Sequence, residues 1–220
     1  MNKLLVSDII DLNNGNYKLA CQSTKLIIRI NGEVNIYFNN EVLEYLDIYL
    51  NDNSILNIYK FNNKKENNLI INIYQNNNSK LNYNEAFINE RNNKLIINNH
   101  INGNDNESLI NIRNISDKNN SEIIINVEVA KNTINNIALE DLKGINNGGF
   151  IHIEPNIVCL SNDVSANHLT TIGSVDNASI DYLMSKGISL ENAKKILLKG
   201  FIYSNMDEYV KKNFGGEDNV

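Results

Sequence analysis

Cysteine is scarce in this chain, which has only Cys21 and Cys159 in 220 residues. So few cysteines give no support to a disulfide-rich scaffold, which needs several paired thiols. The sequence also lacks a CxxC motif and any cysteine–histidine cluster with the spacing of a zinc site. These absences argue against a small domain held together by disulfides or by structural zinc.

Basic charge and long apolar runs are lacking too. The formal net charge is −6 and both signs are mixed, whereas non-specific binding to nucleic acid needs a basic stripe. The apolar run at the start is too short for a secretory signal and is interrupted by Asp8. No apolar stretch approaches the ~18 residues that span a bilayer. We therefore expect a soluble cytoplasmic protein.

Short apolar runs are abundant between Lys25 and Leu160. In most of them Ile, Val, Leu or Tyr alternates with asparagine or a charged residue, as at Asn57, Asn72 and Asn126. This alternation predicts β-strands with one buried face. Clusters of Asn, Asp, Gly and Ser separate the runs and predict turns, because Asn and Asp tolerate left-handed backbone conformations.

The turn clusters recur at a spacing that suggests a repeat. An Asn-Ser pair precedes three runs, at Ser54, Ser79 and Ser121, with separations of about one and two coils of roughly twenty residues or more. In a solenoid, asparagines at the corners can pair along the stack. Because the repeat is degenerate, periodicity alone leaves a solenoid, a sandwich and a barrel open. Residues 1–24 fit either a short helix or a cap over the first coil.

Helical periodicity begins only after Gly173. Asp176 or Asn177 is expected to cap a first helix. Ser189 is expected to cap a second helix, and a third short helix is expected over residues 207–213. The chain therefore changes from strands to helices near residue 173.

The junction between the two patterns resembles a known family. Residues 163–173 read DVSANHLTTIG, and residues 182–201 read YLMSKGISLENAKKILLKGF. The order and spacing of these segments, over about forty residues, resemble the signature of the SufB/SufD family, the β-helical subunits of the SUF iron–sulfur cluster assembly machine. The resemblance implies a mainly β fold, a right-handed β-helix followed by a small helical segment. We expect an N-terminal cap segment at 1–24, a β-helix core at 25–173 and an ATPase-docking helical region at 174–220.

His168 is the first candidate for chemistry. Its imidazole can ligate iron or accept a proton near physiological pH, and the resemblance implies that it lies where two β-helical subunits meet and the cluster is assembled. Leu169 stands where SufD-type members usually have Gly and SufB-type members Glu, and Ala166 stands where SufD-type members commonly have a cysteine. The alternative is a structural histidine at a strand end. Cys159 is a second candidate metal ligand, since thiolate and imidazole both suit iron, with a buried core thiol as its alternative.

The helical segment implies a docking surface for a partner. In the family this region docks the ABC-type ATPase SufC, and a helix face that fits a groove is a suitable physical mode. The alternative is that Leu183, Ile196 and Leu197 simply cap the last coil. The candidate partner-binding residues are Tyr182, Leu183, Met184, Lys186, Gly187, Ile196, Leu197 and Phe201.

The resemblance thus implies a short SufD-like scaffold subunit without the N-terminal helical region of longer members. It would bind a SufC-like ABC ATPase, pair with a SufB-like paralogue or a second copy through the β-helix, hold at most a transient Fe–S cluster, and turn over no substrate. An accessory subunit without its own cluster ligands is the main rival, favoured by Ala166. A β-helix enzyme that acts on polysaccharide is a less favoured alternative, because its active site needs clustered carboxylates. The candidate aspartates of this chain, Asp47, Asp52, Asp105 and Asp163, are scattered along the sequence. The strict hexapeptide repeat of a β-helical acyltransferase is absent.

Overall fold

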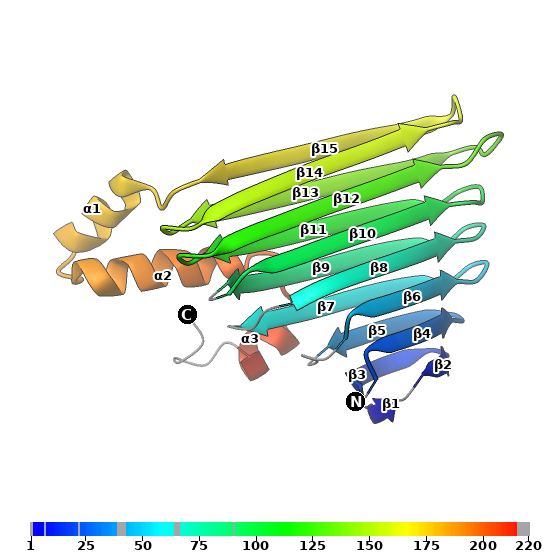
Figure 1. Ribbon diagram of the computed structural model, residues 1–220, viewed down its shortest axis with the longest axis horizontal. Coiled ribbons are helices and arrows are strands. Elements are labelled where there is room, and N and C mark those ends of the chain that lie inside the picture. The colour runs from blue at the N-terminus through cyan, green and yellow to red at the C-terminus, as the bar shows by residue number, and fades with distance from the viewer. Residues whose placement is uncertain are drawn as a thin grey trace.

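The computed structural model describes residues 2–6, 8–21, 23–38, 43–63, 67–89 and 91–214. Strands make up the chain as far as Gly173, and helices follow (Figure 1). The first strands are β1 (Asn2–Val6), β2 (Ile9–Leu12), β3 (Gly15–Cys21), β4 (Lys25–Ile30), β5 (Glu33–Phe38), β6 (Tyr45–Leu50), β7 (Ile55–Asn63) and β8 (Asn67–Gln75). The later strands are β9 (Lys80–Asn89), β10 (Asn93–Ile101), β11 (Glu107–Ser116), β12 (Asn120–Val129), β13 (Asn136–Asn146), β14 (Phe150–Cys159) and β15 (Val164–Gly173). The helices are α1 (Asn177–Ser185), α2 (Leu190–Ile202) and α3 (Glu208–Phe214).

The strands stack into two parallel sheets. Over the described residues, one sheet has eight strands in the order β1-β3-β5-β7-β9-β11-β13-β15, and the other has seven in the order β14-β12-β10-β8-β6-β4-β2. Successive strands thus alternate between the sheets, which is the path of a β-solenoid. Figure 1 shows the coils rising from β1 and β2 at one end to β14 and β15 at the other. The predicted β-helix is confirmed.

The core lies between the two sheets. Alternate residues of each strand face the interior, as in β10, where every second residue from Asn93 to Ile101 is buried. Because the strands pair in parallel and in register, interior residues of one coil stack on those of the next. The interior leucine, isoleucine and valine side chains form one continuous cluster along the solenoid. Burial of this apolar surface is the main stabilising contribution to the fold.

Asparagine ladders run along the outer faces of both sheets. In each ladder a side-chain amide donates a hydrogen bond to the side-chain oxygen one coil earlier. The first ladder consists of Asn16, Asn35, Asn57 and Asn82, and the second of Asp47, Asn72, Asn98, Asn126 and Asn156. A similar bond joins Asn78 to Asn53 at a corner, at 2.7 Å. The expected pairing at the corners is therefore confirmed, and strand faces carry it as well.

The coils lengthen along the chain. Neighbouring residues of the first ladder are 19, 22 and 25 positions apart, and those of the second are 25, 26, 28 and 30 apart. This drift explains the degenerate repeat. It also corrects one predicted alignment: Ser54 and Ser79 precede strands of the eight-stranded sheet, whereas Ser121 lies in β12 of the other sheet.

We expect the replacement Asn98→Ala to lower the free energy of unfolding by about 1–2 kcal/mol, because it removes two part-buried hydrogen bonds. Asn98 donates to Asn72 at 2.9 Å and accepts from Asn126 at 2.8 Å. Urea unfolding measures the change. The control is Asn192→Ala on the exposed side of α2, with an expected change below about 0.5 kcal/mol. Equal effects of the two replacements would show that the ladder contributes nothing special.

The N-terminal segment continues the solenoid. The described part of residues 1–24 forms β1, β2 and β3, with β1 paired to β3 and β2 paired to β4. The short-helix alternative is therefore wrong: Leu12 is buried while its neighbour Asp11 is exposed, which is the alternation of a strand. Met1, Ser7 and Gln22 lie outside the described residues, as do residues 215–220 of the expected C-terminal region.

A polar cluster of Lys60, Tyr83 and Glu85 interrupts the apolar interior at β7 and β9. Lys60 forms an ion pair with one oxygen of the Glu85 carboxylate, and the hydroxyl of Tyr83 donates to the other. The side chains of Lys60 and Glu85 are 5% and 1% exposed, so solvent screens the pair very little. Burial and the Glu85 charge hold the pKa of Tyr83 well above its usual value, so its hydroxyl stays a donor. Both oxygens of this buried acid thus have partners.

The helical tail packs on the outer face of the eight-stranded sheet. A second apolar cluster joins Tyr37 of β5, Ala86 of β9 and Ile115 of β11 to Ile202 and Val210 of the tail. Figure 1 shows α1 beyond the ends of the strands, while α2 contacts β11 and α3 contacts β7. Within the described part of the chain, no helix has the length and apolar character needed to cross a membrane.

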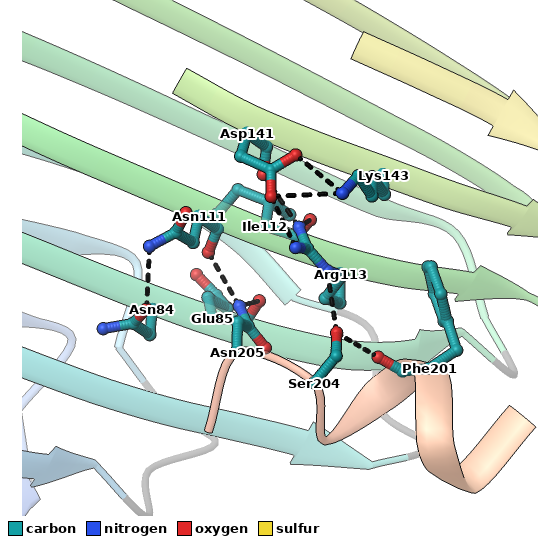
Figure 2. A network of polar contacts seen from close by, with 10 residues as sticks. All are labelled: Asn84, Glu85, Asn111, Ile112, Arg113, Asp141, Lys143, Phe201, Ser204 and Asn205. Atoms are coloured by element: carbon teal, nitrogen blue, oxygen red, sulfur yellow. Dashed lines mark hydrogen bonds and ion pairs between the residues drawn. The ribbon is translucent and has the colours of Figure 1, made fainter. Parts of the chain in front are cut away.

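Polar contacts fix the same tail to the sheet (Figure 2). Arg113 of β11 donates from Nε to Oγ of Ser204 at 3.0 Å and from Nη2 to Oδ2 of Asp141 at 2.6 Å. Burial opposes ionisation of Asp141, but the hydrogen bond and charge of Arg113 more than offset it and lower its pKa. Asn205 donates to the backbone carbonyl of Asn111 at 3.0 Å. These contacts hold the turn after α2 against the sheet.

Candidate functional site

The solenoid ends in two strands whose interior side is not covered by any further described coil. β14 and β15 are the last strands of their sheets, and almost every residue of β15 is exposed. Large apolar side chains at this end are also exposed, namely Val158, Leu160, Leu169 and Ile172. A terminal strand has unpaired backbone N–H and C=O groups along one side, so another strand can pair with it.

His168 lies in the middle of β15, on the interior side of this uncovered end. It is in register with Glu140 of β13, and in-register neighbours of a parallel pair point to the same side of the sheet. Its side chain is exposed because no described coil follows, and no described residue hydrogen-bonds to its ring. The position does not fit a structural histidine at a strand end, and the ring is available to a ligand.

Glu140 is a buried acid without a partner, and sequence reasoning missed it. Its side chain is 3% exposed, and neither carboxylate oxygen has a hydrogen-bond partner among the described residues. On the interior side it lies between Ala138 and Leu142 of β13, with Ile110 of β11 in register. Burial raises the pKa of Glu140 to about 7. The sequence offered one signal, the position of Glu140 in its strand. It occupies one of the alternate positions whose side chains face the interior.

Cys159 also lies on the interior side of the last coil, in register with the buried Val129. It is exposed, so the expected buried core thiol is wrong: β14 is the last strand of its sheet, and nothing described covers it. Cys159 ends β14, whereas His168 is four residues into β15, which offsets the two by about 13 Å along the strands. As a metal ligand, Cys159 stays a prediction.

These donors do not make a complete metal site. Across the described ranges, no group of three or more His, Cys, Asp and Glu side chains lies close enough to hold a metal ion. Glu140 in β13 and His168 in β15 supply two donors at one point near the uncovered end, and Cys159 in β14 supplies one at another. Because protein-bound iron–sulfur clusters usually have four protein ligands, a cluster here needs donors from outside the described residues.

The two helices next to this end have well-defined caps. As predicted, Asp176 caps α1 by accepting from the backbone of Ser179 at 2.9 Å, and Ser189 caps α2. Gly187 has a φ of 85°, a conformation that favours glycine, and it lets the chain reverse after α1. The Lys186 ammonium lies 5.4 Å from the centre of the Tyr182 ring.

The predicted docking residues fall into two groups. Tyr182, Met184 and Ile196 are 62%, 44% and 49% exposed. Lys186 and Gly187 are also exposed. The partly buried members are Leu183, Leu197 and Phe201, and the ring of Phe201 packs on the second apolar cluster.

The alternative in which Ile196 covers the last coil together with Leu197 does not hold for Ile196, because its side chain is exposed. The buried residues of α2 are Ala193 and Ile202, and their spacing of about two and a half turns places them on opposite sides of the helix. Because α2 contacts α1 as well as the sheet, no single stripe along it is buried.

Comparison with known proteins agrees with this geometry. Residues 130–201 match the family model described as SUF system FeS cluster assembly, SufBD core domain. The match covers about a third of the chain, from the turn before β13 into α2, and so contains Glu140, Cys159, His168 and all of α1. A search of curated proteins found no match. The matched domain, together with the two-sheet solenoid and the helical tail that follows it, supports membership of the SufB/SufD family of the SUF iron–sulfur cluster assembly system.

Proposed function

We propose that this chain is a cytoplasmic scaffold subunit on which the SUF system assembles iron–sulfur clusters, and that it is not itself an enzyme. The observation that carries the proposal is that the matched segment, residues 130–201, joins the uncovered end of the β-helix to an exposed helical surface. The cluster is cargo, held transiently at the last coil near His168.

The exposed surface of α1 and the start of α2 is the proposed docking site for a SufC-like ABC ATPase. Tyr182, Met184 and Ile196 expose large apolar side chains there, and such surfaces commonly mark protein contacts. A helix presented to a groove of the partner is the recognition mode that fits. The packing of α2 and α3 on the sheet supports this role, since it gives the surface a firm base.

The uncovered edge of β14 and β15 is the proposed contact with a SufB-like paralogue or with a second copy of this chain. The unpaired edge and the exposed Leu169 and Ile172 support the proposal. Pairing there would bury these side chains and complete the hydrogen bonding of the terminal strands. It would also bring further ligands to His168, which the described residues do not supply.

Co-purification with a SufC-like ATPase tests the docking surface. We expect the double variant Tyr182→Asp/Met184→Asp to weaken ATPase binding at least about 30-fold, because a charge replaces each of two apolar contacts. Both side chains are exposed, so thermal unfolding should stay unchanged. The control is Ile9→Asp, an equally exposed apolar residue on β2 at the opposite end of the solenoid. Undiminished binding by the double variant would place the ATPase elsewhere.

Two other functions remain to be separated from this one. An accessory subunit without its own cluster ligands is favoured by Ala166, which stands where a family cysteine is common, and uptake of iron and sulfide distinguishes it. A polysaccharide-active enzyme finds no support, because its four candidate aspartates are engaged in the stack. Asp47, Asp52, Asp105 and Asp163 all accept hydrogen bonds from asparagine amides of a neighbouring coil.

A further inference from the structure

Two acids that the structure describes in the solenoid interior have different surroundings. Glu85 has Lys60 on one oxygen and Tyr83 on the other. Glu140 is as deeply buried, yet both of its oxygens lack partners among the described residues. An ionised carboxylate in apolar surroundings is costly unless a cation or hydrogen-bond donors accompany it. The fold retains this acid only one coil from the uncovered end.

The position of Glu140 relative to His168 suggests what accompanies it. The two residues are directly in register on adjacent parallel strands, which lie about 4.8 Å apart, and both face the interior side. Two ligands of one transition-metal ion, each about 2.1 Å from it, are roughly 3–4 Å apart. Adjacent in-register positions of this kind let one carboxylate oxygen and one imidazole nitrogen reach the same ion. Ile110, on the other side of Glu140, offers no donor.

We propose that Glu140 and His168 together bind a divalent iron ion at the uncovered end of the solenoid. A carboxylate and an imidazole, without a thiolate, are ligands that suit Fe²⁺ before sulfide is present. The ion enters from the exposed His168 side and is the charge partner of Glu140. This proposal rests on the proposed function, because it takes this end of the solenoid as the place of cluster assembly. Ferrous iron is then the first component of the cluster to bind there.

The test is anaerobic titration of the full chain with Fe²⁺ alone, followed by competition with a chromophoric chelator. We expect Glu140→Gln and His168→Ala each to weaken Fe²⁺ binding at least about tenfold. Glutamine keeps the size of the side chain and removes the buried charge, so circular dichroism and thermal unfolding should show a folded protein. The matched control uses the same residue types on the outer face of the same coil. On that face, Nε2 of His152 lies 3.4 Å from Oε2 of Glu154, and both side chains are about half exposed.

The controls His152→Ala and Glu154→Gln are expected to leave Fe²⁺ binding unchanged. Wild-type protein that binds no Fe²⁺, or a Glu140→Gln variant that binds it as tightly as wild type, would overturn the inference. Equal loss in the outer-face controls would do so too, because it would show surface binding. ATPase co-purification of the same preparations decides the scaffold role separately, since neither Glu140 nor His168 lies on α1 or α2.

Discussion

The replacement Lys60→Met is expected to destabilise the protein by about 3–5 kcal/mol, the largest effect of any single substitution proposed for this chain. Lys60 is the only charged partner of Glu85 among the described residues, and both side chains are buried. Without it, the Glu85 carboxylate stays in the apolar interior with one hydrogen bond from Tyr83. Urea unfolding followed by circular dichroism measures the loss.

Two variants show whether the loss comes from the unpaired buried charge. Lys60→Met/Glu85→Gln removes both charges and keeps an acceptor for Tyr83, so we expect it to recover most of the stability. Lys94→Met breaks the comparable pair with Glu122, whose side chains are 44% and 40% exposed, and should cost less than about 1 kcal/mol. A loss of similar size at Lys94, or no recovery in the double variant, would contradict the explanation.

The second large effect is on the pH dependence of stability in the iron-free protein. The pKa of Glu140 is raised by burial from 4.5 to about 7, so the folded state binds more protons than the unfolded state between these values. Stability from this residue is fully present below about pH 4.5 and is lost as the pH rises through about 7, by up to roughly 3 kcal/mol. The titratable group that faces Glu140 in register is His168.

The variant Glu140→Gln isolates this contribution. Because glutamine does not titrate, its free energy of unfolding should fall less between pH 5 and pH 8 than that of wild type. At pH 8 the variant should be the more stable protein, and near pH 4.5 the two should be similar. Urea midpoints across this range give the comparison. Parallel pH curves for the two proteins would mean that Glu140 ionises in the folded state as easily as it does in solvent.

Much of the fold could be predicted from local patterns. Period-two alternation located the strands, asparagine clusters located the turns, and the caps at Asp176 and Ser189 located two helices. The position of each strand in the stack could not be predicted, because coil length drifts from 19 to 30 residues. The motif around His168 gave the resemblance to the family, whereas periodicity alone did not distinguish a solenoid from a sandwich.

The candidate site was predictable only where a motif marked it. His168 stands in a recognisable segment, but Glu140 lies one coil earlier in a segment that looks like any amphipathic strand. The exposure of Cys159 was also not predicted, because the alternation of its strand is that of a buried core residue. It is exposed because the stack of described strands ends at β14 and β15, and strand alternation does not reveal where a stack ends.

We propose that the last coil of this solenoid, at His168, is the place where a SUF scaffold assembles its cluster. The most direct test is anaerobic incubation of the chain, together with its SufC-like ATPase, with ferrous iron and sulfide, followed by visible absorption and by iron and sulfide analysis. We expect an iron–sulfide absorption band in wild type and in His152→Ala, and the loss of this band in His168→Ala. Equal uptake of iron and sulfide by wild type and His168→Ala, or no uptake by wild type, would contradict it.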